Sequence, residues 1–427
     1  MIILKNVFIL AALAGVLALH AQPAGARVIQ FRNFTTAAAM GPPANEYGVK
    51  LDEVTRTALG RGRNVSFVPL PGVPPIPRQF GDDIVAAVGA GAAGGGFDAA
   101  YNSASQLNET WGFLVNSGTP FGVTWDEFLG FLYGRSRAGQ TGLELVQEIM
   151  DRNRRNVVVF PIVGNAEQLS GYFLEPIGDV DGQRGIGLEG FCQRDWTLRY
   201  LPPAENVFTF ACDALVASGE IPANNLKFVA PIPGGGSLVD AVKAGLLDGF
   251  EFATPLDDVS TQFNTADNPG TVGVRYVHTP GWHQQWLVTW MVVNKDVWNA
   301  LTKAQQVLAL TVARDHVVST YGENLGQQGP ALDYILKANK DDGNPENDMV
   351  LVEWPRRDQA RLRDATIRFL NARARDPSLP QGDRADYAIV LETMRAYVYA
   401  NDFWWDRRQV PTRQRFVGWK NKSPWGR

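Results

Sequence analysis

The stretch VSFVPLPG at residues 65–72 recurs, in altered form, as LKFVAPIPG at residues 226–234. Each copy is a strand-like apolar run that closes in a turn of proline and glycine. Each is followed by a helix-like run, DDIVAAVGAG or LVDAVKAG, and then by a short strand, GGGFDAAY or LLDGFEFA. Strand, turn, helix and strand in this order form the unit from which parallel α/β sheets are built. The stretch therefore predicts an α/β fold.

The two copies of this unit begin at residues 65 and 226, whereas the repeats of solenoid proteins recur every ~20–50 residues. We therefore predict two similar lobes. Within the first copy, Gly89-x-Gly91-x-x-Gly94 has the spacing of a dinucleotide-binding turn, which should follow a strand and open a helix. Here the glycines follow a helix-like run and correspond to AGLLDG in the second copy. We interpret them as a helix end and predict no organic cofactor.

The composition is that of an ordinary globular protein, with 427 residues, 45% hydrophobic and 20% charged. This length predicts two to three domains. The formal net charge of −4 disfavours nucleic-acid binding, which needs a strongly basic face. Two α/β lobes suggest a cleft that closes on a small solute.

The N-terminal residues 1–26 have the pattern of a signal peptide. A single Lys5 precedes an apolar run from Val7 to Leu19, and Ala24-Gly25-Ala26 supplies the small residues of a cleavage site. The apolar run is shorter than the ~20 residues that span a bilayer. We predict cleavage after Ala26 and a periplasmic location.

Recognisable catalytic patterns are scarce. The histidines beyond the signal peptide, His278, His283 and His316, form no zinc motif of the HExxH type. The stretch GGGSLVD lacks a nucleophile elbow because Val239 stands where the last glycine belongs. The lack of these catalytic motifs favours a binding protein over an enzyme. The alternative is an exported metal-dependent enzyme that acts on a small carboxylate in the same cleft.

The two cysteines, Cys192 and Cys212, have two interpretations that their spacing leaves open. The periplasm oxidises thiols, so they could form a disulfide. Free cysteines also pack well in protein cores, so they could be two buried thiols.

Four motifs occur in this order: GTPFGVTWDEFLGFLYG, GNAEQLSGYF, IPGGGSLVDAVKAGLLDGFEFATPLDD and TPGWHQQWLVTWMVVNKDVWNAL. Together they resemble the solute-binding subunits of TRAP (tripartite ATP-independent periplasmic) transporters, especially the branch that binds 2-oxo acids and other small carboxylates. The resemblance runs from about Arg27 to Leu325. It implies a two-lobed periplasmic-binding-protein fold with a cleft between the lobes and long C-terminal helices. It also implies capture of a small organic anion for a membrane permease without chemistry on it, and in some members a homodimer.

The resemblance implies three residues of a cation site. Gln168 in NAEQLSGYF matches a glutamine that contacts a bound cation or solute, and Glu251 in DGFEFATP matches the acidic cation ligand. The next family position is usually Trp, which contributes its backbone carbonyl, and here it is Phe252. Oxygen ligands of this kind suit Na⁺ or Ca²⁺.

The arginine that holds the solute carboxylate in the family has three candidates here, Arg184, Arg194 and Arg199, because the segment before the helix is longer than usual. Arg199 is the best placed, since WTLRYL is strand-like and the expected helix follows it. Its guanidinium could hold a carboxylate through two parallel hydrogen bonds. The resemblance also indicates Trp282, His283 and Tyr101 as cleft residues.

We expect four parts of the chain. Residues 1–26 are the signal peptide. The first lobe comprises 27–160 with about 252–285, and the second 161–251 with about 286–330. Residues 331–427 form C-terminal helices that brace both lobes and end in a basic, aromatic tail.

Overall fold

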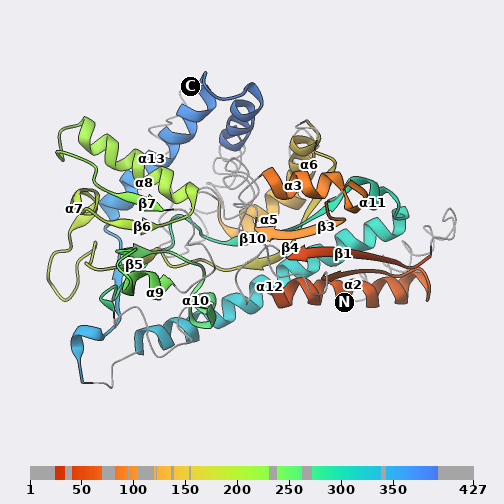
Figure 1. The fold of residues 1–427 in the computed structure, drawn as a ribbon, viewed down its shortest axis with the longest axis horizontal. Coiled ribbons are helices and arrows are strands. Elements are labelled where there is room, and N and C mark those ends of the chain that lie inside the picture. The colour runs from red at the N-terminus through yellow and green to blue at the C-terminus, as the bar shows by residue number, and fades with distance from the viewer. Residues whose placement is uncertain are drawn as a thin grey trace, which may run out of the picture.

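The computed structural model describes most of the chain, from residue 25 to residue 392 with gaps (Figure 1). The described residues are 25–33, 41–69, 82–94, 96–103, 120–121, 123–135, 139–152, 155–229, 238–261, 272–337 and 343–392. The predicted signal peptide up to residue 24, most of both Pro–Gly turns of the repeat, and the basic tail lie outside these residues.

The described strands form two sheets, one in each lobe (Figure 1). The first sheet has the strand order β2 (Val65–Pro69), β1 (Arg27–Asn33), β3 (Ala99–Ser103), β10 (Leu287–Asn294), β4 (Val157–Asn165). The second has the order β11 (Val350–Glu353), β9 (Tyr276–Thr279), β5 (Gly171–Phe173), β8 (Gly249–Phe250), β6 (Thr197–Arg199), β7 (Lys227–Val229). The predicted α/β class with two lobes is confirmed.

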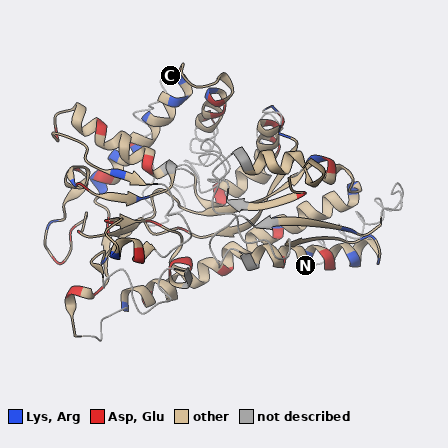
Figure 2. Cartoon of the chain, viewed as in Figure 1, with Lys and Arg blue, Asp and Glu red and all other residues tan. Residues whose placement is uncertain are grey.

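Helices surround both sheets. They are α2 (Gly41–Leu59), α3 (Asp82–Ala90), α5 (Trp125–Tyr133), α6 (Gly142–Arg152), α7 (Gly187–Gln193), α8 (Pro202–Ala217), α9 (Leu238–Lys243), α10 (Pro255–Thr261), α11 (Lys295–Asn299), α12 (Lys303–Lys337) and α13 (Arg356–Arg375). Residues 381–392 are also helical. Among the helices that the structure describes, none is both long and apolar enough to cross a membrane. Figure 2 shows acidic and basic positions interspersed over both lobes.

The predicted repeat is present as the same topology in both sheets. In the first, β2 and β3 lie on either side of β1, and α3 connects them. In the second, β7 and β8 lie on either side of β6, and α9 connects them. These strands are parallel within each sheet, and an antiparallel strand follows, β10 in one lobe and β5 in the other. Gly91, with φ +68°, directly follows α3, so the predicted helix end is confirmed.

The boundaries between the two lobes differ from those expected from the sequence. The first lobe extends past residue 160, because β4 runs to Asn165. The segment 252–285, expected in the first lobe, contributes β9 to the second sheet, and the segment 286–330, expected in the second lobe, contributes β10 to the first. The reason is the strand pairing: β9 pairs with β5 and β11, whereas β10 pairs with β3 and β4. The chain crosses to the second lobe between β4 and β5 (residues 166–170) and returns between β9 and β10 (residues 280–286); these are the two crossing segments. It crosses again along α12, which leads to β11.

The core of the first lobe lies on both faces of its sheet. All residues of β10 are buried, and alternate side chains face opposite sides. Val288, Trp290 and Val292 join one cluster with α5 and α6. Leu287, Met291 and Val293 join the other with α2 and α12. Because helices cover both faces, the strand is continuously apolar rather than alternating.

Two long helices connect the lobes (Figure 1). Helix α12 packs Val312 into the first lobe and Ile335 into the second. Helix α13 packs Leu362 into the second lobe and Phe369 into the first. The long C-terminal helices expected from the resemblance are therefore present. The expected helical region also contains β11, which adds an edge strand to the second sheet.

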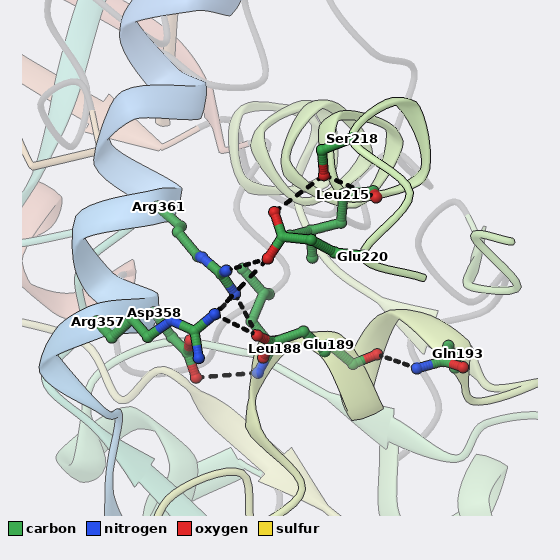
Figure 3. Close-up of polar contacts among 9 residues, drawn as sticks. All are labelled: Leu188, Glu189, Gln193, Leu215, Ser218, Glu220, Arg357, Asp358 and Arg361. Atoms are coloured by element: carbon green, nitrogen blue, oxygen red, sulfur yellow. Dashed lines mark hydrogen bonds and ion pairs between the residues drawn. The ribbon is translucent and has the colours of Figure 1, made fainter. Parts of the chain in front are cut away.

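Helix α7 and the turn after α8 are attached to α13 by charged groups (Figure 3). Arg361 donates to Glu189 Oε1 at 2.6 Å and also pairs with Glu220, and Arg357 lies 2.8 Å from Glu189. The backbone N–H of Leu188 donates to Asp358 at 2.9 Å. These partly exposed pairs orient α13 more than they stabilise it.

The second lobe also contains a disulfide between Cys192 of α7 and Cys212 of α8. Both residues are buried in the core of the second lobe, and their Cα atoms lie 5.5 Å apart. Of the two interpretations that the sequence left open, the disulfide is confirmed.

Candidate functional site

A buried ion pair lies at the edge of the second sheet. Strands β6 and β8 are parallel neighbours with Arg199 opposite Phe250, so Glu251 follows beside Arg199. Arg199 Nη1 donates to Glu251 Oε2 at 2.9 Å and also to the backbone carbonyl of Glu251. The two side chains are 3% and 0% exposed. The carboxyl ends of parallel strands meet at the same sheet edge, which is where α/β proteins usually bind ligands.

The two crossing segments contact each other beside this pair. The backbone N–H of Gln168 donates to the carbonyl of Gln284 at 3.1 Å, and that of Gly281 donates to Glu167 Oε1 at 2.9 Å. A Cβ atom on Gly281 would lie 1.9 Å from the carbonyl oxygen of Gln168, so only glycine permits this approach. The crossing from the first lobe and the return from the second are thus held together at the site.

Tyr200 and His283 connect the ion pair to the crossing segments. His283 Nε2 lies 3.7 Å from Glu251 Oε1, which is too long for a hydrogen bond. The Tyr200 ring is edge-on to that of His283, with centroids 5.8 Å apart, and its hydroxyl donates to the carbonyl of Ser170. Burial raises the pKa of Tyr200 well above its ordinary value, and the charge of Glu251 adds to this, so the hydroxyl stays protonated.

Buried polar atoms without a hydrogen-bond partner gather in this region of the described structure. Native proteins contain few such atoms, and each one needs an explanation, such as a bound ligand, ion or water. Here they are Asn165 Nδ2, Gln168 Oε1, Ser170 Oγ, Glu251 Oε1, Trp282 Nε1, both ring nitrogens of His283, and Gln284 Oε1.

Three of these atoms are oxygens that suit a hard cation: Gln168 Oε1, Glu251 Oε1 and Gln284 Oε1. Within the described part of the chain, no three His, Cys, Asp or Glu side chains gather in a way that could hold a metal ion. An ion here would therefore rely on amide oxygens together with the single carboxylate. Such a donor set fits Na⁺ or Ca²⁺ better than a transition metal.

The comparisons with known proteins agree on the fold. No family model matches the chain. A TRAP transporter solute-binding protein from Bordetella bronchiseptica, which holds copurified calcium and picolinate, is 14% identical, with a TM-score of 0.65 over 90% of this chain and 94% of that one. A TRAP periplasmic solute-binding protein from Colwellia psychrerythraea, with bound calcium and pyruvate, is 17% identical, with a TM-score of 0.62 over 88% and 95%. The chain has the fold of the TRAP solute-binding proteins.

A similarity in sequence points to the same proteins. A monocarboxylate 2-oxoacid-binding periplasmic protein from a Nostoc species is 23% identical over 217 residues. The match covers 51% of this chain and 49% of the relative, so it spans about half the length of each. The resemblance drawn from the four sequence motifs is therefore confirmed.

The three candidate arginines have different environments in this TRAP fold. Arg199 is buried in the ion pair with Glu251. Arg184 is exposed and follows the turn at Val180–Gln183. Arg194 is 41% exposed and pairs with Glu175. Of the three, only Arg199 lies beside the buried polar atoms.

The aromatic candidates lie at different depths. Phe252 is half-buried between the cores of both lobes, with its ring centroid 5.9 Å from the Arg199 guanidinium. Trp282 stacks on Phe121 with centroids 5.3 Å apart and belongs to the core of the second lobe. Tyr101 lies in β3, and its hydroxyl is 3.0 Å from Thr289 Oγ1 within the first lobe. The structure thus brings Phe252 and Trp282 to the site and gives Tyr101 contacts in the first lobe.

Sequence reasoning missed three polar residues of the site, Asn165, Ser170 and Gln284. All three lie on or beside the crossing segments and are buried. The sequence did contain a signal for them: they are polar residues within or beside the quoted motifs, and a polar residue that is buried there needs a partner. Asn165 and Ser170 lie within or next to the GNAEQLSGYF motif, and Gln284 directly follows His283.

A second acidic group lies behind the ion pair. Asp258 accepts a hydrogen bond from the Tyr172 hydroxyl at 2.8 Å and one from the backbone N–H of Ala253 at 3.2 Å. Burial raises the pKa of Asp258 well above its ordinary value; the Tyr172 hydroxyl opposes this, and the charges of Asp257 and Glu251 add to it. Asp258 is therefore destabilised in its charged form inside the fold.

Proposed function

We propose that this chain is the periplasmic solute-binding subunit of a TRAP-type transporter. It captures a small organic acid, a 2-oxo acid or another small carboxylate, and delivers it to a membrane permease. The observation that carries this proposal is the buried Arg199 beside three oxygens that have no hydrogen-bond partner in the described part of the chain, Gln168 Oε1, Glu251 Oε1 and Gln284 Oε1. A guanidinium and a bound cation next to each other would both attract the negatively charged oxygens of a carboxylate.

Arg199 has the donors that a carboxylate needs. Both of its hydrogen bonds to described residues use Nη1, which leaves Nη2 and Nε for a ligand. A carboxylate held by these two nitrogens would form two parallel, charge-assisted hydrogen bonds. The negative charge of the solute would also balance the positive charges of Arg199 and the cation, which is needed because unpaired charges are costly in a buried site.

The cation would be held by Glu251, Gln168 and Gln284, with the carbonyl of Phe252 as a fourth ligand. When bound, it supplies positive charge to the solute oxygens. Among the relatives described above, the Colwellia protein holds calcium together with pyruvate, and the Nostoc protein binds monocarboxylate 2-oxo acids. These relatives are binding proteins, and we infer that this chain likewise binds its solute without transforming it.

Thermal unfolding of the chain from Arg27 onward, with pyruvate, 2-oxobutyrate or picolinate and with Ca²⁺ or a chelator, tests the proposal. A solute present at a free concentration of 100 times its dissociation constant should stabilise the folded protein by about 2.7 kcal/mol. Calorimetric titration of Arg199→Ala should show a large loss of affinity, whereas the matched control Arg184→Ala, at an exposed position, should bind as the wild type does. Steady conversion of the solute, or no stabilisation by any carboxylate, would contradict the proposal.

A further inference from the structure

We propose that the solute carries, besides its carboxylate, a second polar group that both donates and accepts hydrogen bonds, and that His283 and Ser170 select for this group. The inference rests on the proposed function and narrows its class of solutes. It excludes 2-oxo acids with purely aliphatic tails as the preferred ligands.

His283 is buried with unused hydrogen-bonding capacity. It is 1% exposed, and its ring lies edge-on to the rings of Tyr200 and Trp282, at 5.8 Å and 5.6 Å between centroids. Neither ring nitrogen has a hydrogen-bond partner among the described residues. A neutral imidazole offers one N–H donor and one acceptor nitrogen. Leaving both unpaired in a buried position is unfavourable, so a ligand that satisfies them gains affinity.

Ser170 contributes a second unused group, next to the hydroxyl end of Tyr200. It is fully buried, and its Oγ has no partner in the described part of the chain. Its backbone is fixed, because its N–H donates to the carbonyl of His278 at 2.7 Å and its own carbonyl accepts the Tyr200 hydroxyl. The Tyr200 proton is therefore already used. His283 and Ser170 thus both contact Tyr200, and each keeps hydrogen-bonding atoms for a ligand.

The chemistry of the remaining atoms decides the class of solute. On the proposed function, the carboxylate would bind Arg199 and the cation would bind Gln168 Oε1, Glu251 Oε1 and Gln284 Oε1. A methyl or ethyl tail would leave the polar atoms of His283 and Ser170 unpaired. A hydroxyl group donates one hydrogen bond and accepts others, and so matches both residues. Sites built to bind a hydroxyl reject the analogue that lacks it far more strongly than apolar pockets reject a hydroxyl.

The test compares 3-hydroxypyruvate with 2-oxobutyrate, which share the carboxylate and the 2-oxo group and differ by –CH₂OH against –CH₂CH₃. Calorimetric titration of the chain from Arg27 onward, with Ca²⁺ and with a chelator, should give at least ~tenfold tighter binding of 3-hydroxypyruvate. His283→Phe and Ser170→Ala should each reduce this ratio.

Two further variants separate recognition from folding. His283→Gln keeps a donor and an acceptor and should keep the preference for 3-hydroxypyruvate. Ser218→Ala makes the same chemical change as Ser170→Ala at an exposed position of the second lobe and should leave the ratio unchanged. Circular dichroism establishes that each variant is folded before it is titrated.

The outcomes distinguish this inference from the proposed function. If the wild type binds both compounds equally, or if the ratio survives in both His283→Phe and Ser170→Ala, the inference is wrong and the proposed function stands. If neither compound binds with Ca²⁺ or without it, the inference is wrong. If, in addition, no carboxylate stabilises the chain in thermal unfolding, the proposed function fails as well.

Discussion

Replacing Glu251 with Gln should destabilise the ligand-free protein by about 3–5 kcal/mol, the range found when one partner of a buried ion pair is removed. The substitution keeps the shape of the side chain and removes its charge. Arg199, whose side chain is 3% exposed, then stays charged without a counter-ion. The bond from Arg199 to the backbone carbonyl of residue 251 survives, so we expect the lower part of the range.

The geometry supports this magnitude. At 2.9 Å between Arg199 Nη1 and Glu251 Oε2, two unit charges attract by about 6 kcal/mol at an effective dielectric constant of ~20. Desolvation of both groups offsets part of this attraction in the wild type. In Glu251→Gln the attraction is lost, but the desolvation of Arg199 persists.

Urea unfolding, followed by circular dichroism and by tryptophan fluorescence, measures the free energy of unfolding. The matched control is Asp195→Asn, which makes the same carboxylate-to-amide change in the Lys227–Asp195 pair, whose side chains are 62% and 75% exposed. It should cost no more than about 1 kcal/mol. The double variant Arg199→Met/Glu251→Gln should lose less than the sum of the two single variants, because neither charge is then left alone.

The result that refutes this reasoning is a Glu251→Gln variant as stable as Asp195→Asn. It would mean that Arg199 does not depend on Glu251 for its charge balance. Additive losses in the double variant would likewise show that the two side chains act independently.

Two further predictions concern stability. Replacing Cys192 and Cys212 by Ser opens a loop with a sequence separation of 20 and should lower the free energy of unfolding by about 3 kcal/mol; an unchanged urea midpoint would contradict it. Because the pKa of Asp258 is raised in the folded state, its contribution to stability is lost as pH rises from about 4, its unfolded value, towards the folded value. Asp258→Asn should therefore gain stability relative to the wild type between pH 4 and pH 8 in thermal unfolding, and parallel profiles would contradict this.

Much of the fold follows from local sequence patterns. The strand, turn and helix periodicities at 65–72 and 226–234 predict two similar α/β units, and both are present with the same topology. Such patterns depend on residues that are close in the sequence, so they can be recognised without knowledge of the tertiary contacts. The choice of Arg199 among three arginines also rested on a local pattern, because a strand end followed by a helix places its last side chain at the sheet edge.

The lobe to which each of the segments 252–285 and 286–330 belongs could not be predicted from local sequence patterns. Nothing local in β9 or β10 shows which sheet each strand joins, because β9 pairs with β5 and β10 with β4, and both of these partners lie more than a hundred residues earlier in the sequence. Pairing between distant strands is a property of the whole chain, so the segments 252–285 and 286–330 were placed in the wrong lobes.

The sequence by itself determined the α/β class, the repeat and the residues Gln168, Glu251 and Arg199 as candidates for one site. Only the tertiary structure decided that Cys192 bonds to Cys212 and that Ser170, His283 and Gln284 hold buried atoms without partners among the described residues. The physical reason is that a side chain's need for a ligand depends on which neighbours already satisfy its hydrogen bonds. Those neighbours come from both crossing segments and two parallel strands, and only folding brings them together.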